Sequence, residues 1–283
     1  MRSKFPEWLR PAAPKRPQLA SLGGELAAAG VHTVCQSARC PNLGECFGRG
    51  TATFMILGNA CTRDCRFCAV NHGRPSAPDP GEPRRIAEAA KRLGLRFVVI
   101  TSVTRDDLAD GGAAHFAVTI AAVRDLLPGA RVEILVPDLG GNPDAIRTAL
   151  QARPDVFGHN LETVPRLYPE VRPQAGYRRS LEVLRLAGEN AADMITKSGL
   201  MVGLGEDGEE VLSVMRDLRE VGVSRLTIGQ YLQPTRGHAA VAEYVTPEVF
   251  ASYARHARHL GFARVMSAPL VRSSYYAEQF AQG

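Results

Sequence analysis

The sequence contains no cysteine after Cys68 and no apolar run that approaches the roughly 18 residues of a membrane span. Its N-terminal segment is basic and rich in proline but has no apolar core, which excludes a secretory signal, and the prolines would break a transit-peptide helix. The net charge of +5 could favour an acidic partner or an anionic cofactor, and a solvated surface explains it equally well. We therefore expect a cytoplasmic protein that binds neither membrane nor nucleic acid.

A GxGxxG loop is also missing after the first expected strand, which argues against dinucleotide binding. Apolar segments instead alternate with amphipathic helical patterns, and about six such repeats predict a parallel sheet, in a barrel or a doubly wound layer. The expected strands lie in 51–58, 96–103, 132–139, 156–163, 194–205 and 224–234, and the expected helices in 84–94, 115–127, 143–152, 177–190 and 208–222.

Polar residues gather where these strands end, as in TSVTRDD, HNLET and GLGEDGEE. Barrels hold their chemistry at the C-terminal ends of the strands. We therefore predict an α/β fold, a partial (β/α)6 barrel over 51–264. An N-terminal extension (1–50) and a C-terminal extension (265–283) would cover its open end.

The six cysteines form two triads of unlike spacing. Cys61, Cys65 and Cys68 make a C-x3-C-x2-C run directly after the first expected strand. A buried helix face would also show this spacing, but Phe67 is the only other apolar position inside the run. Zinc sites usually pair cysteines in C-x2-C knuckles, and disulfide scaffolds are short and spread their cysteines. The clustering therefore favours an iron–sulfur cluster.

Three thiolates can hold three irons of a [4Fe–4S] cube and leave the fourth iron open. C-x3-C-x2-C is the shared signature of radical S-adenosylmethionine (SAM) enzymes, in which the amino and carboxyl groups of SAM chelate that open iron. One electron from the reduced cluster then cleaves SAM to methionine and a 5′-deoxyadenosyl radical. The spacing thus predicts a radical enzyme of the SAM-dependent type.

Cys35, Cys40 and Cys46 form a less common C-x4-C-x5-C run before the barrel. A second [4Fe–4S] cluster there could lie over the open end and face the same cavity. It could relay electrons to the SAM cluster or act as a source of sulfur. From the residues alone, His32 is the more obvious fourth ligand, because it lies three positions before Cys35 and imidazole suits iron.

Other polar residues at strand ends are candidates for binding SAM. Asn160 and Glu162 could take its ribose hydroxyls or ammonium, or could form a strand-capping network. Lys197, Ser198 and Gln230 have a similar claim. The run Arg105, Asp106 and Asp107 could bind the polar end of SAM, or cap the following helix. His256 and His259 share a helix face that is expected to be solvated.

The chain as a whole resembles the lipoyl synthase family. The segments that carry the resemblance are CQSARCPNLGECF, CTRDCRFCAV and RSSY, supported by TSVTRDDLADGGA, GHNLETV and KSGLMVGLGE, and they extend from about residue 30 to residue 280. A methylthiotransferase would usually need an added RNA-binding domain, and an electron carrier would not need a barrel. Deoxyadenosine release from SAM separates an enzyme from a carrier.

The resemblance implies that Cys61, Cys65 and Cys68 bind the radical-SAM cluster, and that Cys35, Cys40 and Cys46 bind an auxiliary cluster whose fourth ligand is Ser274. It implies insertion of two sulfur atoms, at C6 and C8 of an octanoyl chain on a carrier lysine, with the auxiliary cluster as donor. The expected partners are octanoylated lipoyl domains of 2-oxoacid dehydrogenases, the glycine-cleavage H protein, a ferredoxin or flavodoxin reductant, and an iron–sulfur carrier that rebuilds the spent cluster.

Overall fold

A computed structural model describes residues 5–9, 24, 26, 28–37, 40, 42, 45–46, 52–190 and 194–282. Most of the N-terminal extension expected over 1–50 lies outside these residues, although all six cysteines lie within them. None of the helices in the described ranges combines the length and the hydropathy that crossing a bilayer requires.

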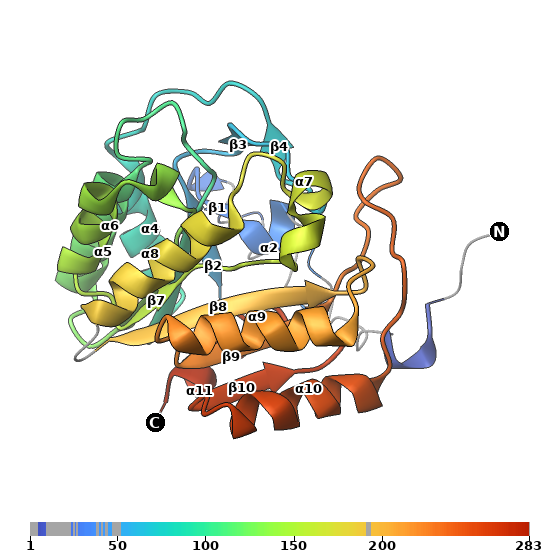
Figure 1. Ribbon diagram of the computed structural model, residues 1–283. Coiled ribbons are helices and arrows are strands. Elements are labelled where there is room, and N and C mark those ends of the chain that lie inside the picture. The colour runs from blue at the N-terminus through green and yellow to red at the C-terminus, as the bar shows by residue number, and fades with distance from the viewer. Residues whose placement is uncertain are drawn as a thin grey trace.

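One curved sheet of eight strands runs through the molecule (Figure 1), in the order β1-β2-β5-β6-β7-β8-β9-β10. The six expected strands are all present and parallel: β2 (Thr53–Ile56), β5 (Phe97–Ser102), β6 (Arg131–Leu135), β7 (Val156–Gly158), β8 (Ile195–Val202) and β9 (Arg225–Gln230). A further parallel strand that was not predicted, β10 (Arg264–Ser267), pairs with β9, and β1 (His32–Thr33) pairs antiparallel with β2. The open, partial barrel is thus confirmed.

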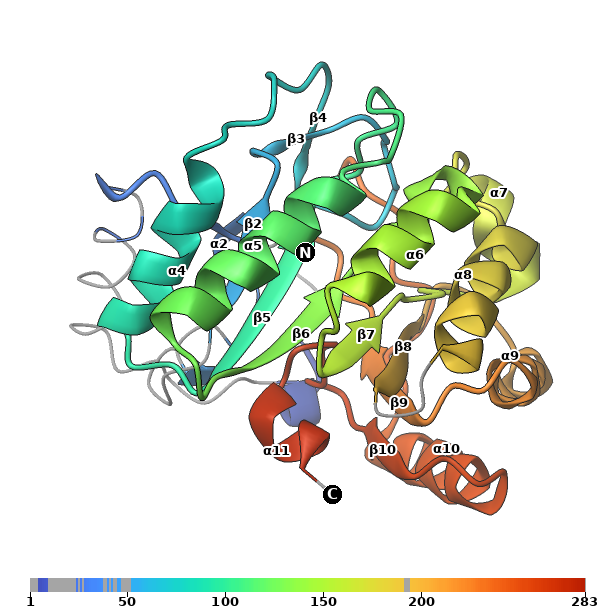
Figure 2. The same cartoon turned by 90° about the vertical axis from the view of Figure 1, so that its left-hand side faces the viewer.

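Helices cover the outer face of the sheet (Figure 2), as expected when each crossover returns a parallel strand to the same sheet. They are α4 (Glu82–Arg92), α5 (Ala113–Leu126), α6 (Pro143–Gln151), α8 (Tyr177–Glu189), α9 (Gly208–Glu220) and α10 (Pro247–His259). The short elements are η1 (Glu7–Leu9), α2 (Val34–Ser37), β3 (Ala60–Cys61), β4 (Asn71–His72), η2 (Leu139–Gly141), η3 (Pro165–Leu167), α7 (Tyr168–Val171) and α11 (Ala277–Ala281).

Because side chains alternate along a strand, every second residue faces the barrel interior. At the N-terminal ends of the strands the interior is closed by α11, whose Ala277 and Ala281 pack against Phe97, Val99 and Val156. The opposite end, where the strands finish, stays available for polar loops. The fold therefore gathers the loops after β2, β5, β6 and β7 around one mouth.

The C-terminal segment 268–276 runs back along the inner wall, where two glycines make room for it. A Cβ atom on Gly229 of β9 would lie 2.0 Å from the Val271 carbonyl oxygen, and one on Gly199 of β8 would lie 3.0 Å from Ser273 Oγ. Any larger residue at Gly229 would displace the segment. These two positions therefore fix where residues 271–274 sit relative to the mouth.

Candidate active site

The C-x3-C-x2-C triad lies in the loop that leaves β2. Cys61 ends β3, which pairs with β4, and the Cys61 sulfur accepts backbone N–H groups from Thr104 (3.3 Å) and Arg63 (3.5 Å). A turn follows, in which the Cys68 N–H donates to the Cys65 carbonyl (2.9 Å). Because Thr104 follows β5, the first cysteine is anchored to a neighbouring strand end as well as to its own loop.

A buried arginine inside the motif holds this loop to two strand ends. Arg63 donates to both carboxylate oxygens of Asp106 (2.6 and 2.7 Å) and of Asp138 (2.8 and 2.9 Å). Asp138, after β6, is almost fully buried, and Arg63 nearly so. Paired bidentate contacts of this kind give geometric precision. Asp106 thus anchors the loop, and at the start of α5 it is the Asp110 side chain that accepts the N–H groups of Gly112 and Ala114.

The three thiols are close enough to influence one another. Burial raises the pKa of Cys68 to about 12 and also raises the pKa of Cys65. The neighbouring Cys61 raises the pKa of Cys65 further. All six cysteines are free, which removes the disulfide alternative. No group of three His, Cys, Asp or Glu side chains in the described ranges converges on a single ion. Three separated thiols suit a [4Fe–4S] cube, which binds each on a different iron and keeps it deprotonated.

The loop after β7 holds the side chains of Asn160 and Glu162 together. The Asn160 side-chain nitrogen donates to Glu162 Oε1 (3.0 Å) and to Ser273 Oγ (2.6 Å) of the C-terminal segment. Glu162 has a positive φ of 67°, which is costly for a residue with a side chain and is common where function requires it. Burial raises the pKa of Glu162, and its charge in turn contributes to raising the pKa of Cys65 and Cys68. This carboxyl group therefore faces the cysteine triad.

The other proposed SAM contacts on the strands are not brought to this place. Lys197 forms a buried ion pair with Glu133 (2.7 Å) and lies over the ring of Phe280, near the closed end of the barrel. Ser198 shares its strand face with Leu200 and Val202, which pack in the core under α9. Lys197 is therefore separated from the mouth by its distance along the strand, and Ser198 by the direction of its side chain.

Gln230 is also engaged structurally. Its amide donates to the carbonyls of Tyr231 and Glu243 and accepts the Val245 N–H, so it holds the loop between β9 and α10. On α10, His256 and His259 are exposed and bind carbonyls of their own helix, in agreement with the predicted solvated face.

The second triad lies beside the first strand pair. Cys35 is buried in α2, and its carbonyl accepts the Cys40 N–H (3.0 Å), while the Cys46 N–H donates to the Asn42 carbonyl (2.9 Å). Burial raises the pKa of Cys35, and Cys40 adds to this rise. His32 lies on β1, in register with Met55 of β2.

Residues around the second triad are tied to the C-terminal segment. The Asn42 amide donates to the Leu270 carbonyl (2.6 Å), the Tyr275 hydroxyl donates to Glu45 (3.1 Å), and the Tyr276 hydroxyl also donates to Glu45. Ser274 directly precedes these tyrosines, and Glu45 directly precedes Cys46. The folded chain therefore brings the RSSY segment to the second triad across more than two hundred positions of sequence.

Arg272 of this segment is a buried cation that is influenced by residues near both triads. Burial lowers the pKa of Arg272, and the nearby Cys40 and Glu162 oppose that change. A Cβ atom on Gly229 would lie 3.2 Å from a guanidinium nitrogen of Arg272, so this side chain crosses the inner wall of the barrel. Cys40 belongs to the second triad, and Glu162 acts on the pKa of Cys65 and Cys68 in the first, so Arg272 lies near residues associated with both triads.

Sequence reasoning missed the roles of Arg63, Arg172 and Arg272. The motif CTRDC contains Arg63, but nothing in its spacing indicates that Asp106 and Asp138 meet it. Arg172 lies in a segment, PEVRP, without any recognisable pattern. Its guanidinium binds the carbonyls of Asn160 (3.1 Å) and Leu161 (2.8 Å) and so supports the loop after β7.

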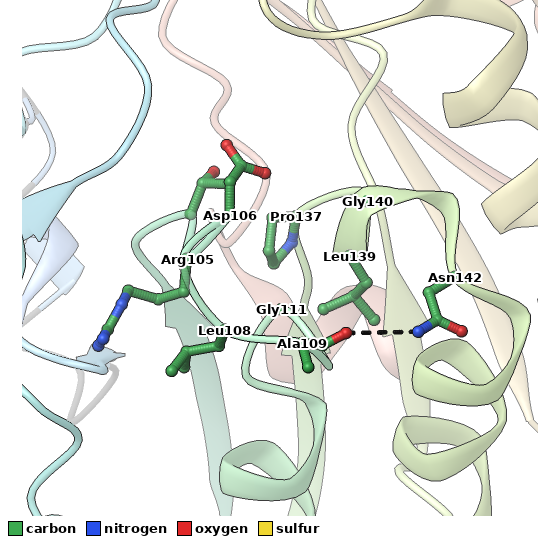
Figure 3. Close-up of a pocket in the computed structure, with 10 residues that line it drawn as sticks. Arg105, Asp106, Leu108, Ala109, Gly111, Pro137, Leu139, Gly140 and Asn142 are labelled. Carbon is green, nitrogen blue, oxygen red and sulfur yellow. Dashed lines mark hydrogen bonds between the residues drawn. The ribbon is translucent and has the colours of Figure 1, made fainter.

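A separate cavity of about 290 Å³ lies between the loops that follow β5 and β6. Figure 3 shows its lining, with the Asn142 amide reaching back to the Ala109 carbonyl. Asp106 contributes to the wall, so the cavity borders the arginine clamp, but its lining contains none of the cysteines.

Comparison with known proteins agrees with this geometry. The family model described as the Radical SAM superfamily matches residues 55–228. The chain is 57% identical over 274 residues to the lipoyl synthase of Rubrobacter xylanophilus, covering 97% of this chain and 85% of that protein. It is 58% identical over 278 residues to the lipoyl synthase of Caldanaerobacter subterraneus subsp. tengcongensis, covering 98% and 97%.

Among solved structures, methylornithine synthase (PylB) aligns with a TM-score of 0.59 at 17% identity, covering 76% of this chain and 63% of that one. The hydrogenase maturase HydG aligns with a TM-score of 0.60 at 13% identity, covering 81% and 61%. At such identities these likenesses concern the fold alone. Together with the sequence relatives, they lead to one conclusion: the chain belongs to the lipoyl synthase family of radical SAM enzymes, which use SAM and a [4Fe–4S] cluster.

Proposed function

We propose that this enzyme inserts two sulfur atoms, at C6 and C8 of an octanoyl chain that is amide-linked to a lysine of a lipoyl carrier protein. The observation that carries the proposal is the pair of cysteine triads, one in the loop after β2 and one whose neighbours Asn42 and Glu45 bind the C-terminal segment. An unactivated methylene has no leaving group, so each new C–S bond needs its own radical and its own SAM molecule.

Cys61, Cys65 and Cys68 are the proposed ligands of the radical-SAM cluster. When bound, this cluster supplies the electron that cleaves SAM and gives the 5′-deoxyadenosyl radical. The chain itself keeps the loop in place through Arg63 and its two carboxylate partners. Asn160 and Glu162 are the proposed contacts for the ribose hydroxyls or the ammonium of SAM, because they face the same triad.

Cys35, Cys40 and Cys46 are the proposed ligands of an auxiliary [4Fe–4S] cluster that provides the sulfur, with Ser274 as its fourth ligand. Support comes from the contacts of Asn42 and Glu45 with the segment that contains Ser274. A serine oxygen is a poorer partner for iron in a sulfide cube than a thiolate, so this ligand is the one expected to dissociate when sulfur leaves.

The further partners follow from this chemistry. A cytoplasmic ferredoxin or flavodoxin would deliver the electrons, and an iron–sulfur carrier would rebuild the auxiliary cluster after each product. The octanoylated lipoyl domains of 2-oxoacid dehydrogenases and the glycine-cleavage H protein are the proposed acceptors.

The direct test is anaerobic incubation of the reconstituted enzyme with SAM, a reductant and an octanoylated carrier domain, followed by mass spectrometry of the carrier. We expect the carrier lysine to gain two sulfur atoms, with two deoxyadenosines formed per product. Omission of SAM is the control. A carrier that stays octanoylated while deoxyadenosine accumulates would show that the enzyme acts on another substrate.

Free octanoic acid is expected to be a poor substrate. It lacks the docking surface of the carrier, and it places a carboxylate where the tethered chain has a neutral amide, which is costly to bury. Product formation from the acid and from the octanoyl carrier should be compared at equal concentration. Similar turnover of the two would contradict recognition of the carrier.

A further inference from the structure

We propose that Arg172 is the buried counter-charge of the radical-SAM cluster and sets how readily that cluster is reduced. The inference rests on the proposed binding of this cluster by Cys61, Cys65 and Cys68. It concerns a residue outside the cysteine motif, more than a hundred positions further along the chain.

The residue directly before Arg172 contacts the cysteine loop through its backbone carbonyl. Arg172 caps the short helix α7, and the preceding Val171 carbonyl accepts the Arg66 N–H (2.9 Å) from between Cys65 and Cys68. The guanidinium of Arg172 binds the carbonyls of Asn160 and Leu161 and lies 5.1 Å from the centre of the Tyr168 ring. Residues 171 and 172 therefore join the cysteine loop, through the Val171 carbonyl, to the loop that carries Glu162, through the Arg172 guanidinium.

The charge of Arg172 lacks the partner that a buried cation normally has. Its exposure is only 8%, its Nε atom is buried without a hydrogen-bond partner, and none of the ion pairs among the described residues includes it. Burying a cation is expensive unless an anion compensates it. The remaining anionic groups at this place are Glu162, whose pKa burial raises, and the cysteine triad.

Arg63 is another buried arginine at this place, and its partners differ from those of Arg172. Both cations are buried, Arg63 inside the cysteine motif and Arg172 directly after the residue that binds the Arg66 N–H. Arg63 is, however, neutralised by two carboxylates that it contacts directly, whereas Arg172 is bound by neutral carbonyls and a hydroxyl. Its charge is therefore not cancelled by a directly bound carboxylate and acts on Glu162 and on the cluster. Uptake of one electron from a ferredoxin, a flavodoxin or dithionite adds one negative charge to the cluster, and a nearby buried cation favours that state.

The test is a potentiometric titration followed by electron paramagnetic resonance of the reduced cluster. It uses the full chain with Cys35, Cys40 and Cys46 changed to Ala, so that a single cluster gives the signal. In this background, Arg172→Gln should lower the ratio of reduced to oxidised cluster at a fixed potential by about tenfold or more, which is about 59 mV for one electron. Arg172→Lys keeps the charge and should stay within about threefold of the parent.

Arg166→Gln is the matched control, because Arg166 lies six positions earlier, is exposed and is paired with Glu210 (2.8 Å). Removing the Arg166 charge should leave the midpoint reduction potential of the cluster unchanged, since exposed charges are screened. The proposal would be overturned if fully iron-loaded Arg172→Gln had the same midpoint reduction potential as Arg166→Gln. It would also be overturned if Arg172→Lys and Arg172→Gln shifted that potential equally.

Two further outcomes are decisive. If Arg172→Gln holds no iron, the iron-loaded Arg172→Lys protein becomes the test. A change of about tenfold in its ratio of reduced to oxidised cluster would refute the role of charge. If the background protein holds no iron, the assignment of the cysteines has failed, and the inference fails with it.

Discussion

Changing Cys61, Cys65 and Cys68 together to Ala is expected to abolish deoxyadenosine formation, because these are the thiols that border Glu162 and follow the first barrel strand. Changing Cys35, Cys40 and Cys46 to Ala should preserve SAM cleavage and eliminate sulfur insertion. Deoxyadenosine is measured by chromatography, and the lipoyl product by mass spectrometry, in parallel samples.

Iron analysis provides the internal check on both variants. The parent chain should hold about eight irons after reconstitution, and each triple variant about four. Deoxyadenosine formation by the Cys61, Cys65 and Cys68 variant would reverse the assignment of the triads. A fully active parent with only about four irons would leave no place for a second cluster.

Changing Ser274 to Ala should reduce lipoyl product by about tenfold or more while SAM cleavage is much less affected. The reason is that Ser274, the proposed oxygen ligand of the auxiliary cluster, directly precedes the tyrosines that bind Glu45 beside the second triad. Iron content, Mössbauer spectra and product should be followed in the same preparation. Ser274→Cys should assemble the auxiliary cluster but retain its iron and stall sulfur transfer, because a thiolate binds that iron more firmly.

Two controls separate Ser274 from its neighbours. Ser273 accepts a hydrogen bond from Asn160, so Ser273→Ala should affect the SAM side of the cavity instead. His32→Ala tests the ligand that the spacing near Cys35 suggests. Normal lipoyl formation by Ser274→Ala, together with loss of it in Ser273→Ala or His32→Ala, would move the fourth ligand to one of those residues.

The fold could be predicted from the sequence because strand and helix periods alternate so regularly. All six expected strands formed, and α4, α5, α6, α8 and α9 begin and end within a few residues of the expected ranges. Strand β10 was missed because RVMS is short and partly exposed, so it lacks the apolar run of an interior strand. The segment 268–276 was expected to cover the open end, but its path along Gly199 and Gly229 depends on contacts between distant residues.

The cysteine ligands could be proposed from spacing, since short-range spacing is what a cluster requires. The surrounding charges could not. Arg63 meets Asp138 from a loop seventy-five positions away, and Arg172 meets Asn160 and Leu161 through the loop after β7. Asn160 and Glu162 could be proposed as SAM contacts because they lie just after a strand. Lys197 was misleading because a lysine in a strand gives no sign of a buried partner such as Glu133.

The contacts of Asn42 and Glu45 with Leu270, Tyr275 and Tyr276 span 228 to 231 positions of sequence, which has a consequence for biosynthesis. At ribosomal rates, the partners emerge on the order of ten seconds or more after the cysteines they cover. The contacts that join the second triad to the C-terminal segment therefore form only at the end of translation. If this triad binds the proposed auxiliary cluster, detachment of residues 268–276 would expose it without melting the barrel, so reloading between products would require only local unfolding.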